Sequence, residues 1–145
     1  MYIVRKAYGY VTHISNDTKQ VLVFRHPLLT IAEGGIQIPK GTIMEDEPPL
    51  EAVRREIIEE TGLTDFTVEG ELAVDEWEYC HEHIHERHER HFFLLTVNNV
   101  PDEWYHKVTG EGGDEGVIFH YFWISSTDEV ELAAHHGDYL NTVFP

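Results

Sequence analysis

The stretch from residue 41 to residue 63, GTIMEDEPPLEAVRREIIEETGL, limits the fold of this chain more than any other. Pro48 and Pro49 stand where a helix can begin, because proline suits the first helical turn and is excluded from the helix interior. Gly62 stands where that helix should end, since glycine adopts the left-handed cap conformation without steric cost. The sequence therefore predicts one helix between these two signals.

The predicted helix carries an acidic face and an apolar face. Glu56, Glu59 and Glu60 are related as i, i+3 and i+4, so a helix stacks their three carboxylates on one side. Apolar residues repeat at helical spacing on a different face, which is expected to enter a core: Leu50, Val53 and Ile57.

The three stacked carboxylates have two interpretations. On an exposed helix their mutual repulsion costs only a few tenths of a kcal/mol per pair, so they can form a solvated acidic face. Alternatively they form a site for a hard cation, because Mg²⁺ takes oxygen ligands and often uses one or two carboxylates together with substrate phosphates. The spacing of the flanking residues decides between these interpretations.

The complete spacing resembles the Nudix hydrolase signature. The match holds at every defined position of the signature: Gly41, Glu47, Arg55-Glu56-Ile57, Glu59-Glu60 and Gly62-Leu63. Residues 36–40, IQIPK, also look like the strand and turn that lead into the signature in this family. Lys40 departs from the many relatives that carry a second glycine there, and this difference is expected to alter substrate choice more than chemistry. The hard-cation interpretation is therefore favoured.

The resemblance implies an α/β fold, the Nudix α/β/α sandwich, in which a mixed β-sheet is flanked by helices. It also implies that residues 1–145 form a single Nudix hydrolase domain. The strand and helix patterns by themselves support only an α/β or an α+β domain. Those patterns predict strands at 7–14, 20–26, 66–79 with a break near Gly70, 91–97 and 117–124, and a second helix over 126–137.

The activity implied by the resemblance is hydrolysis of a pyrophosphate bond in a nucleoside diphosphate linked to another moiety. Mg²⁺ or Mn²⁺ is the implied cofactor. Glu56, Glu59 and Glu60 would hold the metal, helped by the backbone carbonyl of Lys40. The metal would neutralise the pyrophosphate and lower the pKa of a bound water molecule.

The general base is expected to be a carboxylate, and Nudix hydrolases differ in which one they use. Glu59 is one candidate. An acid from a late loop often joins the metal site or acts as the base, and Glu115 in the glycine-rich loop 109–116 is the second candidate. Glu111 and Asp114 compete with Glu115, because no motif fixes the choice.

Structural roles are expected for several residues of the signature. Arg55 is expected to pair with Glu47 and to hold the preceding loop against the helix rather than to touch substrate. Gly41 and Gly62, at the two ends of the signature, are expected to have structural roles in the backbone rather than to contact metal or substrate.

Arg25 and Lys40 are the candidates for binding the substrate. Arg25 falls with His26 at the end of a predicted strand, a suitable place for contact with an anionic ligand. The same pair has a second interpretation, a surface pair that softens the acidic field of the chain. Lys40 directly precedes the signature and could contact a phosphate.

Composition limits which binding partners and which cellular compartment suit this chain. A formal net charge of −17 argues against binding a nucleic-acid backbone through a basic patch. It also opposes binding of an anionic substrate, a conflict that bound divalent cations would resolve. No apolar stretch has the length of a membrane span, and Cys80 is the single cysteine, which fits a reducing cytoplasm. The predicted partner is thus a small nucleoside diphosphate derivative, with neither nucleic acid nor membrane, and a homodimer is compatible with the sequence.

Residues 80–91, CHEHIHERHERH, form a second conspicuous segment. In an extended hairpin His81, His83 and His85 would share one face, because strand side chains alternate, and three imidazoles there could hold Zn²⁺ or Ni²⁺. A solvated hairpin tip and a substrate contact are the other two interpretations. The interleaved Glu and Arg residues favour the solvated tip.

Two other functions stand beside hydrolysis. A catalytically silent Nudix-fold module would bind a nucleotide without cleaving it, but its usual mark, loss of the signature glutamates, is missing here. A histidine-rich metal-handling protein would need residues 81–91 to be its functional centre. An assay of pyrophosphate cleavage with and without Mg²⁺ separates the three.

Overall fold

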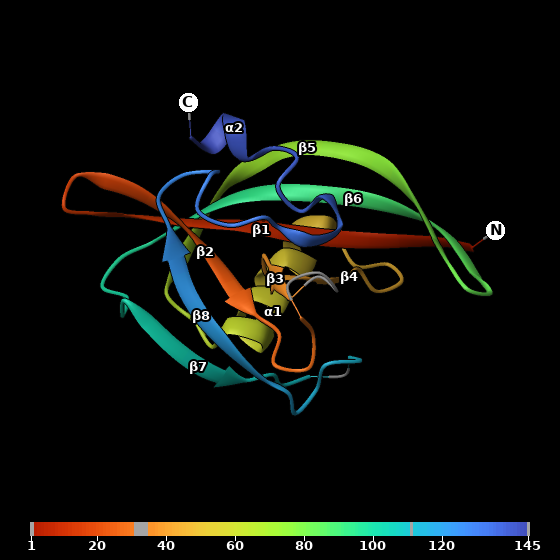
Figure 1. Ribbon diagram of the computed structural model, residues 1–145. Coiled ribbons are helices and arrows are strands. Elements are labelled where there is room, and N and C mark those ends of the chain that lie inside the picture. The colour runs from red at the N-terminus through yellow and green to blue at the C-terminus, as the bar shows by residue number, and fades with distance from the viewer. Residues whose placement is uncertain (1, 31–34, 111, 145) are drawn as a thin grey trace.

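The computed structural model describes residues 2–30, 35–110 and 112–144, and a mixed β-sheet lies at its centre (Figure 1). Within these residues the strands lie in the order β5-β6-β1-β2-β8-β7, with β3 beside β2 and β4 beside β1. β1 pairs with β6 in parallel and with β2 and β4 in antiparallel orientation. The strands are β1 (Tyr2–Ser15), β2 (Thr18–Arg25), β3 (Ile36–Gln37), β4 (Lys40–Thr42), β5 (Phe66–His81), β6 (Ile84–Val97), β7 (Glu103–Lys107) and β8 (Ile118–Ile124).

The predicted central helix is confirmed as α1 (Pro49–Thr61). Pro48 precedes it in extended conformation, and Gly62 ends it in the left-handed conformation at φ 80°. Val53 and Ile57 enter the core that α1 forms with one face of the sheet, as expected. Leu50 does not, since 40% of its surface is exposed in the first turn of the helix.

The opposite face of the sheet is covered by the C-terminal segment (Figure 1). That segment contains one turn of 3₁₀ helix, η1 (Ala133–His135), and a short helix, α2 (Leu140–Val143). The predicted helix over 126–137 is therefore wrong. Residues 130–132 have no regular structure, and Val130 and Leu132 both pack on the core beneath, whereas a helix would turn residues two apart to different sides. Helices thus flank a mixed sheet as expected, but the layer formed by the C-terminal segment is thin.

β5 and β6 form a hairpin that is longer than predicted. β6 begins at Ile84 rather than at residue 91, because the strands continue through the histidine-rich segment to a tight turn at residues 82 and 83. The expected break near Gly70 is present as a register shift between Val68 and Gly70. The prediction that three histidines share one strand face is wrong, since His81 ends β5, His83 lies in the turn, and His85 belongs to β6.

The other differences concern short elements. β4 and β7 were not predicted, because a few residues that pair with a neighbouring strand carry no periodic signal of their own. β1 starts at Tyr2, five residues before the predicted strand, where it continues alongside β6.

None of the helices in the described part of the chain is long and apolar enough to cross a membrane.

A buried arginine holds the C-terminal segment on the sheet. Arg90 on β6 is 2% exposed and binds both carboxylate oxygens of Asp75, at 2.7 and 2.6 Å. It also donates to Asp138 Oδ2 at 3.1 Å and to the carbonyl oxygen of His135 at 3.2 Å. Tyr139 donates its hydroxyl to Asp75 Oδ2 at 2.6 Å. This ion-pair network connects β5 and β6 to the chain that follows η1.

We expect Asp75→Asn to lower the free energy of unfolding by about 2 to 4 kcal/mol, because it removes the bidentate partner of the buried Arg90 and leaves only Asp138 to compensate that charge. Urea unfolding measures the change. Glu76→Gln is the matched control, since Glu76 is the next residue on β5 and its side chain is exposed. Its carboxylate lies 3.8 Å from Nε of Arg87. The control should stay within about 0.5 kcal/mol of wild type. Equal losses in the two variants would contradict an anchoring role for Asp75.

Candidate metal and substrate site

The carboxylates of α1 line a cavity of about 270 Å³ between the helix, β4 and the loop that follows β7. Its wall also includes basic side chains from β1 and β4 and the glycine-rich loop after Val108. The charged residues that line it are Lys6, Lys40, Arg55, Glu56, Glu59, Glu60 and Asp114. The residues that the signature placed on one helix face are thus brought together with groups from distant parts of the chain.

A wider hollow of about 660 Å³ lies beside the C-terminal segment. Trp77, His135 and Asp138 are among the residues that line it, and the signature carboxylates are not. The smaller cavity therefore carries the chemistry that the sequence points to.

Glu60 is the most deeply buried of the three helix carboxylates, with 6% of its surface exposed. Its Oε1 atom accepts a hydrogen bond from the backbone N–H of Lys40 at 3.3 Å. Burial raises the pKa of Glu60 to about 8, against the opposing effect of the Lys40 charge. Burial likewise raises the pKa of Glu56, and the hydrogen bond from Arg55 offsets part of that rise. Without a cation, this cavity therefore disfavours a full set of ionised carboxylates.

Arg55 binds the loop before the helix and two of the carboxylates. It donates two hydrogen bonds to the Glu47 carboxylate, at 2.8 and 2.9 Å, and one to the carbonyl oxygen of Thr42 at 2.9 Å. Its Nη1 atom donates to Glu56 at 2.6 Å and to Glu59 at 3.1 Å. The pairing with Glu47 is the one proposed from the sequence, whereas the bridge between Glu56 and Glu59 is additional. A guanidinium in this place reduces the repulsion between the two acids.

At two glycines, the absence of a side chain leaves room for the carboxylates of Glu56 and Glu59. A Cβ atom on Gly41 would lie 1.8 Å from the carboxylate carbon of Glu56. A Cβ atom on Gly110, which has φ of 93°, would lie 2.4 Å from the carboxylate carbon of Glu59. Gly41 belongs to the signature, but Gly110 lies in the late loop, where the sequence gives no spacing that would identify it.

We expect Gly41→Ala to weaken Mg²⁺ or Mn²⁺ binding by at least about tenfold, because the new methyl group displaces the Glu56 carboxylate from the cavity. Calorimetric titration measures the affinity. Gly112→Ala is the matched control, since Gly112 lines the same cavity but a Cβ atom there would have open space around it. Unchanged affinity in Gly41→Ala would place the metal away from Glu56.

The late loop contributes Asp114 to the cavity wall. Asp114 Oδ1 lies 3.3 Å from Nε2 of His26. The backbone N–H of Leu28 donates to Nδ1 of the same imidazole at 3.2 Å, which leaves Nε2 to carry the proton of the neutral ring and to face Asp114. Glu115 is exposed and does not line the cavity, and Glu111 lies outside the described residues.

Two lysines line the cavity opposite the acidic helix face. Lys40 donates from Nζ to Gln37 Oε1 at 3.0 Å, and Lys6 donates from Nζ to Thr42 Oγ1 at 3.0 Å. Burial, followed by the neighbouring Lys40 charge, lowers the pKa of Lys6. Sequence analysis missed Lys6, because it reaches the site only through the pairing of β1 with β4. Arg25 is exposed at the end of β2 and does not line the cavity.

A family profile described as NUDIX domain matches residues 5–142 of the chain. Among solved structures, the chain is similar to the Ap4A hydrolase of C. elegans, with 20% sequence identity, a TM-score of 0.66, and coverage of 98% of this chain and 96% of that one. It is also similar to a MutT protein from Methanosarcina mazei Go1, with 19% identity, a TM-score of 0.64, and coverage of 97% and 92%.

A third similar structure is the NUDIX domain of Shewanella oneidensis NrtR, solved with ADP ribose. The identity is 13%, the TM-score is 0.67, and the match covers 99% of this chain and 88% of that one. At such identities these likenesses establish the fold alone. A search of curated proteins by sequence found no match.

Proposed function

This chain belongs to the NUDIX domain family, and on that premise we propose that it is a divalent-metal-dependent hydrolase. The proposed reaction cleaves a pyrophosphate bond in a nucleoside diphosphate linked to another moiety. The observation that carries the proposal is the cavity in which three carboxylates of one helix face two lysines. Opposite charges gathered in one cavity suit a ligand that is itself a metal-bound anion.

The residues present fit Mg²⁺ or Mn²⁺ in this cavity. Glu56, Glu59 and Glu60 offer carboxylate oxygens, the ligands that hard cations prefer, and Gly41 leaves their space open. The backbone carbonyl of Lys40 is a further proposed ligand. A bound cation would neutralise the diphosphate and acidify a water molecule.

The chain's own side chains have distinct proposed roles. Lys6 and Lys40 bind phosphate oxygens, because both residues line the cavity and lie on strands that pair with each other. Glu59 takes the proton of the attacking water, since its side chain is 23% exposed and is the most accessible of the three helix carboxylates. Arg55 holds Glu56 and Glu59 in position. Arg25, at the strand end, remains a proposed contact for the part of the substrate outside the cavity.

The proposed late-loop acid can be identified by comparing two variants. We expect Asp114→Asn to lower kcat by about tenfold or more, because Asp114 lines the cavity, and Glu115→Gln to leave kcat within about twofold of wild type. Steady-state kinetics at saturating Mg²⁺ measures both. If Glu115 is the acid that acts in the reaction, the order of the two effects reverses.

A substrate panel tests the proposed function itself. Nucleoside diphosphate sugars, dinucleoside polyphosphates, nucleoside triphosphates and ADP-ribose are incubated with the protein, with Mg²⁺ or with a chelator, and phosphate-containing products are separated. We expect cleavage of at least one panel member that depends on the metal. Binding of a panel member without cleavage would contradict the proposal and would favour a nucleotide-binding module.

A further inference from the structure

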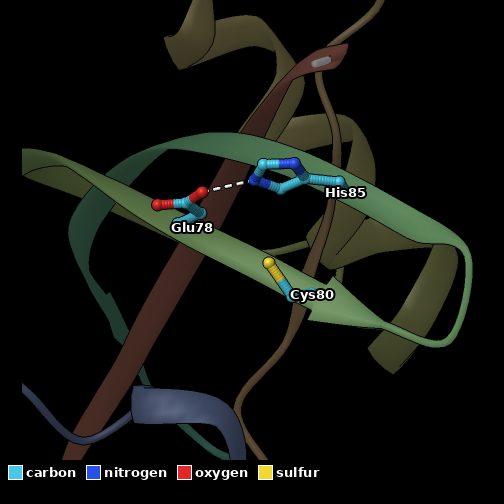
Figure 2. A group of neighbouring side chains, drawn as sticks. All are labelled: Glu78, Cys80 and His85. Carbon is cyan, nitrogen blue, oxygen red and sulfur yellow. Dashed lines mark hydrogen bonds and ion pairs between the residues drawn. The ribbon is translucent and has the colours of Figure 1, made fainter.

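The β5–β6 hairpin carries a second group of metal-ligating side chains near its tip. Glu78 and Cys80 lie on β5, and His85 lies on β6 directly opposite Cys80 in the register of the two strands (Figure 2). None of the three lines the cavity beside α1. The group therefore lies outside the cavity proposed for hydrolysis.

Strand geometry explains why these three side chains meet. Glu78 and Cys80 are two residues apart, so they point to the same face of β5. A residue directly opposite on an antiparallel neighbour shares that face, and its Cβ atom lies roughly 5 Å away. His85 consequently reaches both, and its Nε2 atom is hydrogen-bonded to Glu78 Oε1 (Figure 2).

The ligand atoms of the three residues all lie within 4.8 Å of one another. Around a tetrahedral Zn²⁺, with bonds of about 2.0 to 2.3 Å, ligand atoms stand roughly 3.3 to 3.8 Å apart. The hydrogen-bonded atoms of His85 and Glu78 lie closer together than this and would have to move apart, whereas 4.8 Å is the upper limit for the group. All three side chains are exposed, so rotation about their side-chain bonds can make these adjustments without repacking a core. A cation that binds both His85 and Glu78 would replace the hydrogen bond between them.

We propose that Glu78, Cys80 and His85 form a binding site for Zn²⁺, with water as the fourth ligand. The donor set is one thiolate sulfur, one imidazole nitrogen and one carboxylate oxygen, which suits a borderline-soft cation and not Mg²⁺. This site differs from a cluster of His81, His83 and His85, because the turn separates those histidines and the strand register selects Cys80 and Glu78 instead.

The single cysteine of the chain makes the proposal directly measurable. The tag-free protein, kept under nitrogen with excess Mg²⁺ to occupy the α1 carboxylates, is alkylated with iodoacetamide, with and without one equivalent of Zn²⁺. Mass spectrometry follows the modification of Cys80. We expect Zn²⁺ to slow alkylation at least tenfold, because a metal-bound thiolate is a weaker nucleophile than a free one.

Variants of neighbouring residues locate the ligands. His85→Gln and Glu78→Gln should lose the protection, while His83→Gln, which changes an exposed histidine in the adjacent turn, should keep it. The rates with and without Zn²⁺ are compared within each form, because Glu78 and His85 lie close enough to Cys80 to change the reactivity of the free thiol. As a second readout, Co²⁺ should give thiolate charge-transfer absorption in wild type and His83→Gln, and none in Cys80→Ser.

Three results would overturn the proposal. The first is the absence of protection in wild type. The second is full protection in His85→Gln, which would show binding without the imidazole. The third is an equal loss of Zn²⁺ protection in His83→Gln and His85→Gln, which would show that Zn²⁺ binds at no fixed place in the histidine-rich segment.

Discussion

Glu59→Gln and Glu60→Gln should each lower kcat by at least about a hundredfold while leaving the fold intact. Each substitution removes a charged oxygen ligand from the proposed metal site, and a loss of about 3 kcal/mol of transition-state stabilisation corresponds to about a hundredfold in rate. The fold should survive, because both side chains belong to a face where like charges repel when no metal is bound. The measurement is kcat at saturating Mg²⁺ with a substrate identified from the panel.

Glu51→Gln is the matched control for this loss. Glu51 lies in the first turn of the same helix, is exposed and does not line the cavity. It should retain a wild-type rate, and far-UV circular dichroism should be unchanged in all three variants. Wild-type kcat in Glu59→Gln or Glu60→Gln would remove that carboxylate from the reaction.

The second large effect is on stability, where Glu60→Gln should stabilise the metal-free protein. Burial raises the pKa of Glu60 to about 8 in the folded protein, from an ordinary value of 4.5. Between those two values the folded state holds a proton that the unfolded state releases. The wild type therefore loses stability as pH rises from about 4.5 to about 8, and an amide that cannot ionise does not.

The expected difference at pH 8 is on the order of 3 kcal/mol in favour of the variant, or roughly 6 to 12 °C in Tm. Thermal unfolding in the presence of a chelator, at pH values from 5 to 9, measures it. The gap between the two proteins should be small at pH 5 and should widen as pH rises. A gap that does not change with pH would contradict the raised pKa of Glu60, and Glu51→Gln should show no such trend.

Adding metal should narrow the difference in stability between the two proteins. A ligand that binds only the folded state stabilises it by about 2.7 kcal/mol at a hundredfold excess over Kd. Mg²⁺ or Mn²⁺ should therefore raise the Tm of wild type, and Glu60→Gln should respond less. Equal Tm shifts in the two proteins would locate the stabilising metal outside the α1 cavity.

The sequence predicted α1 well because the signals that define it are local. Pro49, Gly62 and the spacing of the carboxylates each depend on residues within a few turns of helix, and the structure places the helix ends where these signals lie. The same local reasoning failed at residues 126–137. There the side chain of Glu129 does reach back to the backbone N–H of Ser125, at 2.9 Å, but residues 130–132 then have no regular structure, and Val130 and Leu132 pack on the sheet.

The β5–β6 hairpin shows the same limit of local reasoning, because here a strand is present where the sequence resembled a connection. Polar residues interleaved with histidines resemble a solvated connection, yet β6 passes through them, because it pairs with β5 on one side and with β1 on the other. Backbone hydrogen bonds on both sides stabilise a strand whatever its side chains favour. Strand register, which no local pattern reveals, then placed Cys80 opposite His85.

The sequence by itself determined the helix, the stacking of its three carboxylates and the resemblance to one family, since each depends on the spacing of residues that are close together in the chain. Only the tertiary structure decided which groups complete the site. Lys6, Gly110 and Asp114 reach the carboxylates of α1 from one strand and from a loop about 50 residues beyond the helix. The physical reason is that a cavity is formed by segments brought together through sheet pairing and burial, and that assembly leaves no periodic trace in the chain.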